Sequence, residues 1–198
     1  MTISFIGAGN VATNLGSLFN QAGHTVFYGK RQPNAPQLSI ADAINQGEII
    51  CFAVPYSAMK GLLTEFREAL AGKIVIDITN PINIQDWSPL LLGQENSSGE
   101  ETARLLPQSK VVKAFNSIFA DVMLQDKQVF KGEKLTAFIA SDALEAANIV
   151  KQLADDAGFS GFIVGGIKNA RYLEAMAHLN IAIASSGGTN AGFKYFQH

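Results

Sequence analysis

The chain alternates short apolar runs with longer segments in which apolar residues recur every three or four positions. The apolar runs are rich in β-branched residues and lie at 3–6, 25–28, 49–54, 74–78, 111–115, 135–140 and 162–164. Several are apolar at consecutive positions, which is typical of strands covered on both faces. The alternation therefore predicts a Rossmann-like, doubly wound α/β fold, in which a mostly parallel sheet carries helices on both faces.

Local signals predict where some of the helices begin and end. Asp142 and Glu145 have the spacing of a capping box, and Gly158 stands where that helix should stop. Residues 98–101 repeat the capping signal ahead of a short helix through Leu106, and one long helix is expected over 168–184. Between the fourth and fifth runs, residues 84–99 read as a long loop, and such loops are often functional.

A glycine-rich turn follows the first predicted strand and opens the first helix. Its residues are Gly7, Ala8, Gly9, Asn10, Val11 and Ala12. In this motif Gly7 permits a tight turn, Gly9 lets the backbone approach a pyrophosphate, and Ala12 allows close helix–sheet packing. The helix N-terminus offers free N–H groups to the phosphates. Because the turn lies between a strand and a helix, it predicts dinucleotide binding.

The end of the second predicted strand indicates which dinucleotide is bound. An NAD site would place Asp or Glu about 20 residues after the turn, to bind the ribose hydroxyl. This chain has Lys30 and Arg31 there and no carboxylate. The two bases could hold a 2′-phosphate, or they could simply be solvated residues at a strand end. The pattern favours NADP(H).

The other strand ends complete the predicted pocket, because ligands of a doubly wound sheet lie outside the carboxyl ends of its strands. These ends contribute Ala53, Val54, Pro55, Asn80, Ala114 and Asn116. Asn80 and Asn116 could offer amide groups to a ribose or to the nicotinamide carboxamide. The alternative is that both asparagines only terminate strands or cap helices.

The composition narrows the class of protein. The 198 residues are 47% hydrophobic, carry a net charge of -2, and include 15 basic and 17 acidic side chains, which excludes disorder and predicts no nucleic-acid partner. No apolar run approaches the ~18–20 residues that span a bilayer, and no signal peptide is apparent, so no membrane partner and a cytoplasmic location are expected. Cys51 is the only cysteine, and no metal site is predicted. Without a low-complexity linker, residues 1–198 are expected to form a single domain.

The ordered set of motifs resembles the NADP oxidoreductases that depend on the deazaflavin coenzyme F420. The likeness is carried by residues 5–10, 29–31, 77–81 and 112–116, and it continues at 169–174 and 177–180. The resemblance implies a compact Rossmann domain, frequently dimeric, that moves a hydride between NADP(H) and a flavin- or deazaflavin-like acceptor. The chain is also similar to the reductase module of membrane metalloreductases and to the N-terminal half of pyrroline-carboxylate reductases.

The chain departs from the family pattern after its second strand. Only residues 32–40 separate Arg31 from Ala41, where the family usually fits a helix and another strand. Residues 37–40 are expected to be a remnant strand, which would leave the adenine end of the pocket unusually open. A homodimer is expected from the family likeness, with the last helix and the glycine-rich tail at 185–192 contributing to the interface.

No side chain stands out as a catalytic acid or base. His24 lies in the turn before the second strand, and His178 lies on the last helix, where a packed or surface position is the simpler interpretation. Asp77 is expected to order nearby backbone, and Cys51 to be core. Hydride transfer to a flavin-like small-molecule acceptor needs no dedicated acid, because the cofactor supplies the reactive atom. Two alternatives stay open: a non-enzymatic NADP(H)-binding redox sensor, and a reductase of another acceptor such as a quinone or a metal chelate.

Overall fold

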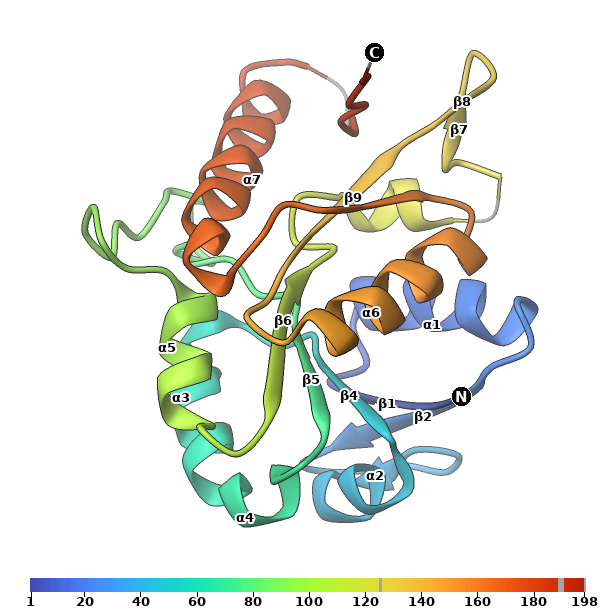
Figure 1. Ribbon diagram of the computed structural model, residues 1–198, viewed down its shortest axis with the longest axis vertical. Coiled ribbons are helices and arrows are strands. Elements are labelled where there is room, and N and C mark those ends of the chain that lie inside the picture. Colours follow the sequence, from blue (N-terminus) through green and yellow to red (C-terminus); the bar gives the residue numbers. More distant parts are fainter. Residues whose placement is uncertain (125, 189–190, 198) are drawn as a thin grey trace.

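One eight-stranded sheet organises the protein in a computed structural model that describes residues 1–124, 126–188 and 191–197 (Figure 1). Its strands run in the order β10-β9-β6-β5-β4-β1-β2-β3. They are β1 (Thr2–Ile6), β2 (Thr25–Lys30), β3 (Leu38–Ser39), β4 (Ile49–Phe52), β5 (Ile74–Asp77), β6 (Lys110–Ala114), β9 (Thr136–Ala140) and β10 (Ser160–Ile163). From β3 to β6 all neighbours are parallel, in the strand order of dinucleotide-binding folds, so the predicted fold class is confirmed.

Helices cover both faces of this sheet (Figure 1). On one face lie α1 (Asn10–Gln21) and α6 (Leu144–Asp156). On the other lie α2 (Ile40–Gln46), α3 (Tyr56–Glu65), α4 (Arg67–Leu70), α5 (Ser98–Leu105) and α7 (Ala170–Ser185). Short 3-10 turns at Ala120–Met123 and Ile167–Asn169 precede a two-stranded hairpin and α7, respectively. No helix in the described part of the chain is long and apolar enough to cross a membrane.

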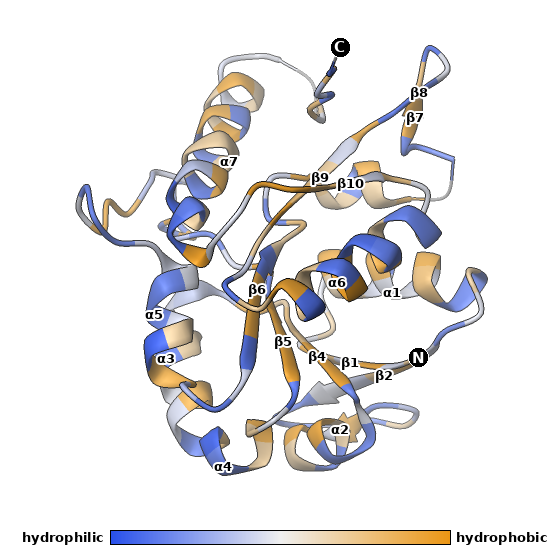
Figure 2. Cartoon of the chain, in the orientation of Figure 1, coloured by the Kyte–Doolittle hydropathy of each residue, from blue (hydrophilic) through white to orange (hydrophobic). Residues whose placement is uncertain are grey.

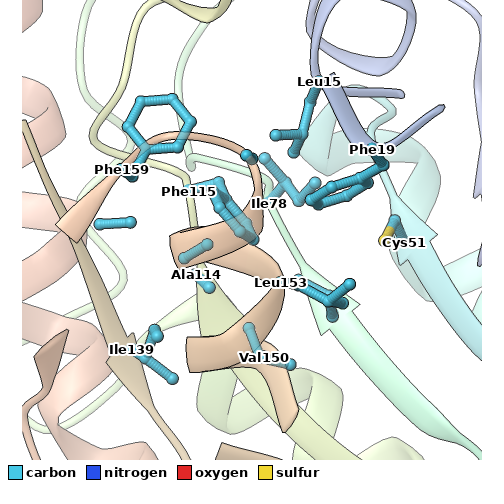
Figure 3. Packing of buried hydrophobic residues seen from close by; sticks show 14 of the residues in the cluster. Leu15, Phe19, Cys51, Ile78, Ala114, Phe115, Ile139, Val150, Leu153 and Phe159 are labelled. Carbon is cyan, nitrogen blue, oxygen red and sulfur yellow. The ribbon is translucent and has the colours of Figure 1, made fainter. Parts of the chain in front are cut away.

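The central strands β1, β4 and β5 are largely apolar, as the hydropathy colouring shows (Figure 2), and nearly all of their residues are buried, since helices cover both faces of the sheet. Leu15 and Phe19 of α1 pack with Val150 and Leu153 of α6 over the strands (Figure 3). Burying each such side chain stabilises the fold by about 1.5–3 kcal/mol. Cys51 lies in the same cluster, where burial raises the pKa of its thiol, so its expected place in the core is confirmed.

All seven predicted runs form strands of the sheet, and three further features concern β3, a separate two-stranded hairpin and the direction of β9. The two-residue β3 is the remnant strand expected at 37–40, so the shortening after β2 is confirmed. The hairpin of β7 (Val129–Phe130) and β8 (Glu133–Lys134) is not among the predicted strands. Strand β9 runs antiparallel to β6, and β10 is parallel to β9, so the end of the sheet reverses direction.

The structure confirms one of the predicted helix signals and corrects two. Gly158 follows α6 with a φ of +89°, as expected for a helix stop. The capping box at Asp142 is wrong, since Ala143 is the N-cap of α6 and Asp142 instead accepts a hydrogen bond from the Ile167 N–H at 3.0 Å. The second box is shifted by one residue, because Ser97 caps α5 by accepting from the Glu100 N–H at 3.1 Å.

The end of the chain folds back onto the sheet after α7. The carbonyl of Phe193 accepts a hydrogen bond from the Thr136 N–H at 2.7 Å, and the Tyr195 ring packs 4.9 Å from that of Phe162. Of the glycine-rich tail, Thr189 and Asn190 lie outside the described residues, as does the terminal His198. Residues 193–195, which follow the glycine-rich tail, therefore cover the outer strands β9 and β10.

Candidate cofactor site

The glycine-rich turn joins β1 to α1, and its two glycines serve different purposes. Gly7 has a φ of +109°, and its N–H donates to the Gly29 carbonyl at 3.0 Å. A Cβ on Gly7 would overlap the carbonyl oxygen of Ala53, so the fold itself requires glycine here. A Cβ on Gly9 would meet nothing within 4 Å. Gly9 therefore leaves an open cradle that the protein does not fill.

The first turn of α1 faces this cradle with free hydrogen-bond donors. Gly9 is the N-cap, and no side chain caps the helix. Within the described ranges, the N–H groups of Asn10, Val11 and Ala12 have no acceptor. Such groups, together with the helix dipole, attract a phosphate.

A cavity of about 610 Å³ extends from the cradle along the carboxyl ends of β4, β5 and β6 to α7. Eight of the predicted site residues line it: Gly9, Asn10, Val11, Ala53, Val54, Pro55, Asn80 and Asn116. No side chain with a formal charge lines the cavity within the described part of the protein. The cavity suits a ligand that is neutral along most of its length and anionic near α1.

Five predicted residues lie outside the cavity lining. Gly7 and Ala8 form the backbone turn beneath it, and Ala114 is fully buried in the hydrophobic core. Lys30 is the last residue of β2, whose Gly29 pairs with Ile6, and Arg31 follows it, so both stand beside the turn. In the described ranges neither side chain has an ion-pair partner, which leaves both available to a ligand.

Asn80 and Asn116 form a reciprocal amide pair at the other end of the cavity. The Asn80 Nδ2 donates to the Asn116 carbonyl at 2.7 Å, and the Asn116 Nδ2 donates to the Asn80 Oδ1 at 2.9 Å and to the Leu173 carbonyl at 3.0 Å. A carbonyl can only accept, so the Leu173 oxygen fixes which amide atom of Asn116 is the nitrogen. The Asn116 Oδ1 is buried without a hydrogen-bond partner in a side chain only 6% exposed. It is an unfilled acceptor on a residue that lines the cavity.

The residue before this asparagine is held in a strained conformation. Phe115 has a φ of +62°, which is unusual for a bulky residue. Its ring is buried between Phe19, 6.0 Å away, and Phe159, 6.3 Å away (Figure 3). Aromatic packing thus stabilises a backbone turn that places Asn116 at the cavity, and strain of this kind is common at functional sites.

The titratable groups near the site are engaged in structural contacts. Asp77 accepts hydrogen bonds from the Thr79 N–H at 2.8 Å and from its hydroxyl at 2.7 Å, so its expected role in ordering backbone is confirmed. The Nε2 of His178 lies 3.0 Å from the Pro81 carbonyl. Tyr56 donates to Glu101 at 2.6 Å, and desolvation raises the pKa of the Tyr56 hydroxyl well above its ordinary value. His24 lies 3.0 Å from Asp156, outside the cavity lining.

Three parts of the cavity lining are not among the predicted site residues, and one of them is residues 117–120 after β6. Ile84 and Trp87 come from the loop at 84–99, which its length marks as functional without indicating which of its residues line the cavity. Asn83 and Asp86 hold this loop in tight turns, accepting from the backbone N–H groups of Gln85 and Ser88 at 3.0 Å each. Another part of the lining belongs to α7 and consists of Ala177, Asn180 and Ile181. Apolar residues clustered in an otherwise polar loop were the available signal.

Comparison with known proteins matches this architecture. Residues 2–81 match the family described as NADP oxidoreductase coenzyme F420-dependent. The chain is 30% identical over 183 residues to the metalloreductase STEAP3 of Rattus norvegicus, covering 88% of this chain and 36% of that protein. It is 30% identical over 154 residues to the F420-dependent NADP reductase of Methanothermobacter marburgensis, covering 71% of this chain and 64% of that protein. The chain thus spans less than two thirds of both relatives.

A solved structure matches over the full length. It is that of a candidate F420-dependent NADP reductase from Arthrobacter sp. FB24, with 26% identity and a TM-score of 0.85, and the match covers 100% of both chains. The matched length therefore includes α7.

Proposed function

The chain belongs to the family of coenzyme F420-dependent NADP oxidoreductases, and from that premise we propose that it transfers a hydride between NADP(H) and a flavin- or deazaflavin-like acceptor. The observation that carries the proposal is the cavity itself. It begins at the open cradle of Gly9, and beside it lies the unpartnered Oδ1 of Asn116. Both features are unfilled positions that match groups of the dinucleotide.

The residues present fit the parts of NADP(H) in order. The free N–H groups of α1 would hold the pyrophosphate, and Lys30 and Arg31 would bind the 2′-phosphate. The Asn116 Oδ1 would accept a hydrogen bond from the carboxamide of the nicotinamide. When bound, NADPH supplies the hydride; the protein orients the ring and excludes water from it.

The remaining walls support a flat, largely apolar acceptor. Ile82, Ile84, Trp87, Phe119 and Ile181 line the cavity with apolar side chains. A flavin or deazaflavin ring has a suitable shape for such a surface, as does a quinone. The apolar lining therefore supports a ring acceptor over a small charged one.

Binding of the two nicotinamide cofactors to the purified protein tests the cofactor. We expect calorimetric titration to give tighter binding of NADPH than NADH. Arg31→Ala should weaken NADPH binding by about ten-fold or more, since a hydrogen bond to a charged group contributes about 1.5–3 kcal/mol. Arg67→Ala is the matched control, because α4 precedes β5 and lies at the amino edge of the sheet. Equal affinity for NADPH and NADH would contradict the assignment of the basic pair.

Turnover distinguishes the proposed enzyme from its alternatives. NADPH oxidation should be measured with coenzyme F420, a free flavin, a quinone and a ferric chelate. Oxidation with either ring system of the flavin type supports the proposal, whereas activity with only the quinone or the chelate favours the other reductase. Tight NADPH binding without turnover on any acceptor favours a redox sensor.

A further inference from the structure

Lys113 is a lysine buried in the middle of the fold, in the strand β6. Its side chain is completely inaccessible to solvent, and its strand neighbours Val112 and Ala114 are apolar. Burying an ammonium group is costly even when it is paired, and an apolar side chain would often serve stability as well. The position therefore calls for a role beyond packing.

Four oxygen atoms surround the Lys113 Nζ. It donates to the Thr79 carbonyl at 2.5 Å and to the Ser98 Oγ at 2.6 Å, and it lies 3.0 Å from the Glu174 Oε1 and 3.3 Å from the Asp77 Oδ1. These partners belong to the end of β5, to α5 and to α7. One ammonium group thus ties three separate segments to β6.

Two of these partners are next in sequence to the groups that orient the site amide. The Asn116 Nδ2 has two acceptors, the Asn80 Oδ1 and the Leu173 carbonyl. Asn80 follows Thr79, whose carbonyl Lys113 holds, and Leu173 precedes Glu174, whose carboxylate Lys113 pairs with. Both acceptors of Asn116 are therefore fixed from the same buried cation.

The α7 side of this arrangement is reinforced by the start of α5. The Glu174 carboxylate also accepts from the Ser98 N–H at 3.1 Å and from the Gly99 N–H at 3.2 Å. A Cβ on Gly99 would come within 2.8 Å of the Ala170 Cβ, so the two helices are in close contact here. The Leu173 carbonyl is consequently held in place by Glu174.

We propose that Lys113 is a positioning residue for the nicotinamide end of the site: it fixes Thr79 and Glu174, and through them it aims the free Asn116 Oδ1 at the cavity. Lys113 is not among the cavity-lining residues, so it acts only through these groups. The inference rests on the proposed function, because it assumes that the cavity holds NADP(H).

Two ligands separate this role from a general contribution to stability. NADPH reaches both ends of the site, whereas adenosine 2′,5′-bisphosphate lacks the nicotinamide and reports only the adenosine end. In Lys113→Met, we expect NADPH to bind about ten-fold more weakly, the loss of one well-aligned hydrogen bond. The affinity for adenosine 2′,5′-bisphosphate should stay within about two-fold, since distant sites are nearly independent.

Lys73→Met is the matched control. The Lys73 Nζ also donates to a backbone carbonyl, that of Gly47 at 2.6 Å, but it lies just before β5 at the opposite edge of the sheet. This variant should bind both ligands as the wild type does. It shows whether removing any carbonyl-bound lysine affects the site.

Lys113→Met leaves Asp77 and Glu174 without their cation, which destabilises the fold. A second, milder variant therefore tests the same role independently. Ser98→Ala keeps every charge and removes one partner of the Lys113 Nζ. It should weaken NADPH binding selectively, by a smaller factor than Lys113→Met. If Lys113→Met does not fold, the selective effect of Ser98→Ala on NADPH binding decides whether the positioning role holds.

The outcomes separate this inference from the proposed function. Wild-type protein that binds neither ligand refutes the proposed function. Wild-type protein that binds NADPH no more tightly than adenosine 2′,5′-bisphosphate overturns the role of the Asn116 Oδ1 and with it the inference. Folded variants that lose both ligands equally, or lose neither, overturn the positioning role alone.

Discussion

Adding one methyl group to each glycine of the β1–α1 turn should produce two opposite phenotypes. Gly9→Ala places a Cβ in space that is empty within 4 Å, on a backbone with φ of -81° and ψ of -176°, which any residue adopts. Gly7→Ala places a Cβ against the Ala53 carbonyl, on a backbone with φ of +109°. The first change should therefore affect the cofactor, and the second should affect the fold.

The magnitudes follow from these two environments. Placing a side chain in the left-handed region costs about 1–2 kcal/mol, and the steric overlap at Gly7 adds to it. For a chain of this length, each kcal/mol lowers Tm by about 2–4 °C. At Gly9 only the N-cap preference changes, but a methyl group in the cradle would hold a pyrophosphate away from the helix. Each charged hydrogen bond lost there costs about 1.5–3 kcal/mol, which is ten-fold or more in Kd.

Thermal unfolding and calorimetric titration with NADPH, run on both variants, measure the two effects. Gly9→Ala should keep a Tm close to that of the wild type while losing NADPH affinity. Gly7→Ala should unfold several degrees lower, by about 2–8 °C from the backbone cost alone. Wild-type NADPH affinity in Gly9→Ala, or a destabilisation as large as that of Gly7→Ala, would refute the assignment of Gly9 to the cofactor and Gly7 to the fold.

Three further predictions concern other parts of the molecule. Phe115→Ala should lower the free energy of unfolding by about 3–5 kcal/mol in a urea titration, because it removes a ring that packs between two buried rings; a loss below 1 kcal/mol would contradict that packing. The hydrogen bond from Arg171 lowers the pKa of Glu100, so this pair stabilises the fold above the ordinary pKa of a glutamate and ceases to do so as the pH falls through the lowered value. Arg171→Met should therefore be less stable than wild type at neutral pH in urea titrations, and the difference should shrink in acid; a pH-independent difference would contradict the pair's role. The homodimer stays a prediction, supported by the exposed Leu179 on α7: light scattering should give a dimer mass that Leu179→Glu reduces, and a wild-type monomer at micromolar concentration would contradict it.

The parts of the fold that sequence predicts well are those set by local pattern. Consecutive apolar residues mark the buried strands, and the glycine-rich turn marks the switch from β1 to α1. Such a pattern does not encode strand direction, so it does not predict that β9 runs antiparallel to β6. The capping signal at Asp142 failed for a related reason: the spacing is right, but the Ile167 N–H from a distant segment takes the carboxylate.

The residues of the candidate site fall into the same two groups: those marked by a local sequence pattern and those brought together only by tertiary contacts. The turn, the basic pair and the two asparagines follow from motifs that are contiguous in sequence. The local sequence does not explain why the apolar strand β6 contains Lys113, because its partners Asp77, Ser98 and Glu174 come from three separate segments. Tertiary contacts of this kind have no local signature.

Departures from ordinary folding rules gather at the carboxyl edge of the parallel strands. This edge holds the left-handed backbone of Phe115, the unpartnered Asn116 Oδ1 and the buried ammonium of Lys113. Each is unfavourable for the isolated domain, and each is stabilised by dedicated contacts: aromatic packing, the amide pair and the two carboxylates. Sequences that fold well satisfy such rules elsewhere and depart from them where a ligand binds. If these three positions had only structural roles, a small residue in the turn, an apolar side chain in the strand and a fully hydrogen-bonded amide would serve as well. All three departures occur near the same end of one cavity, which supports this cavity as the binding site.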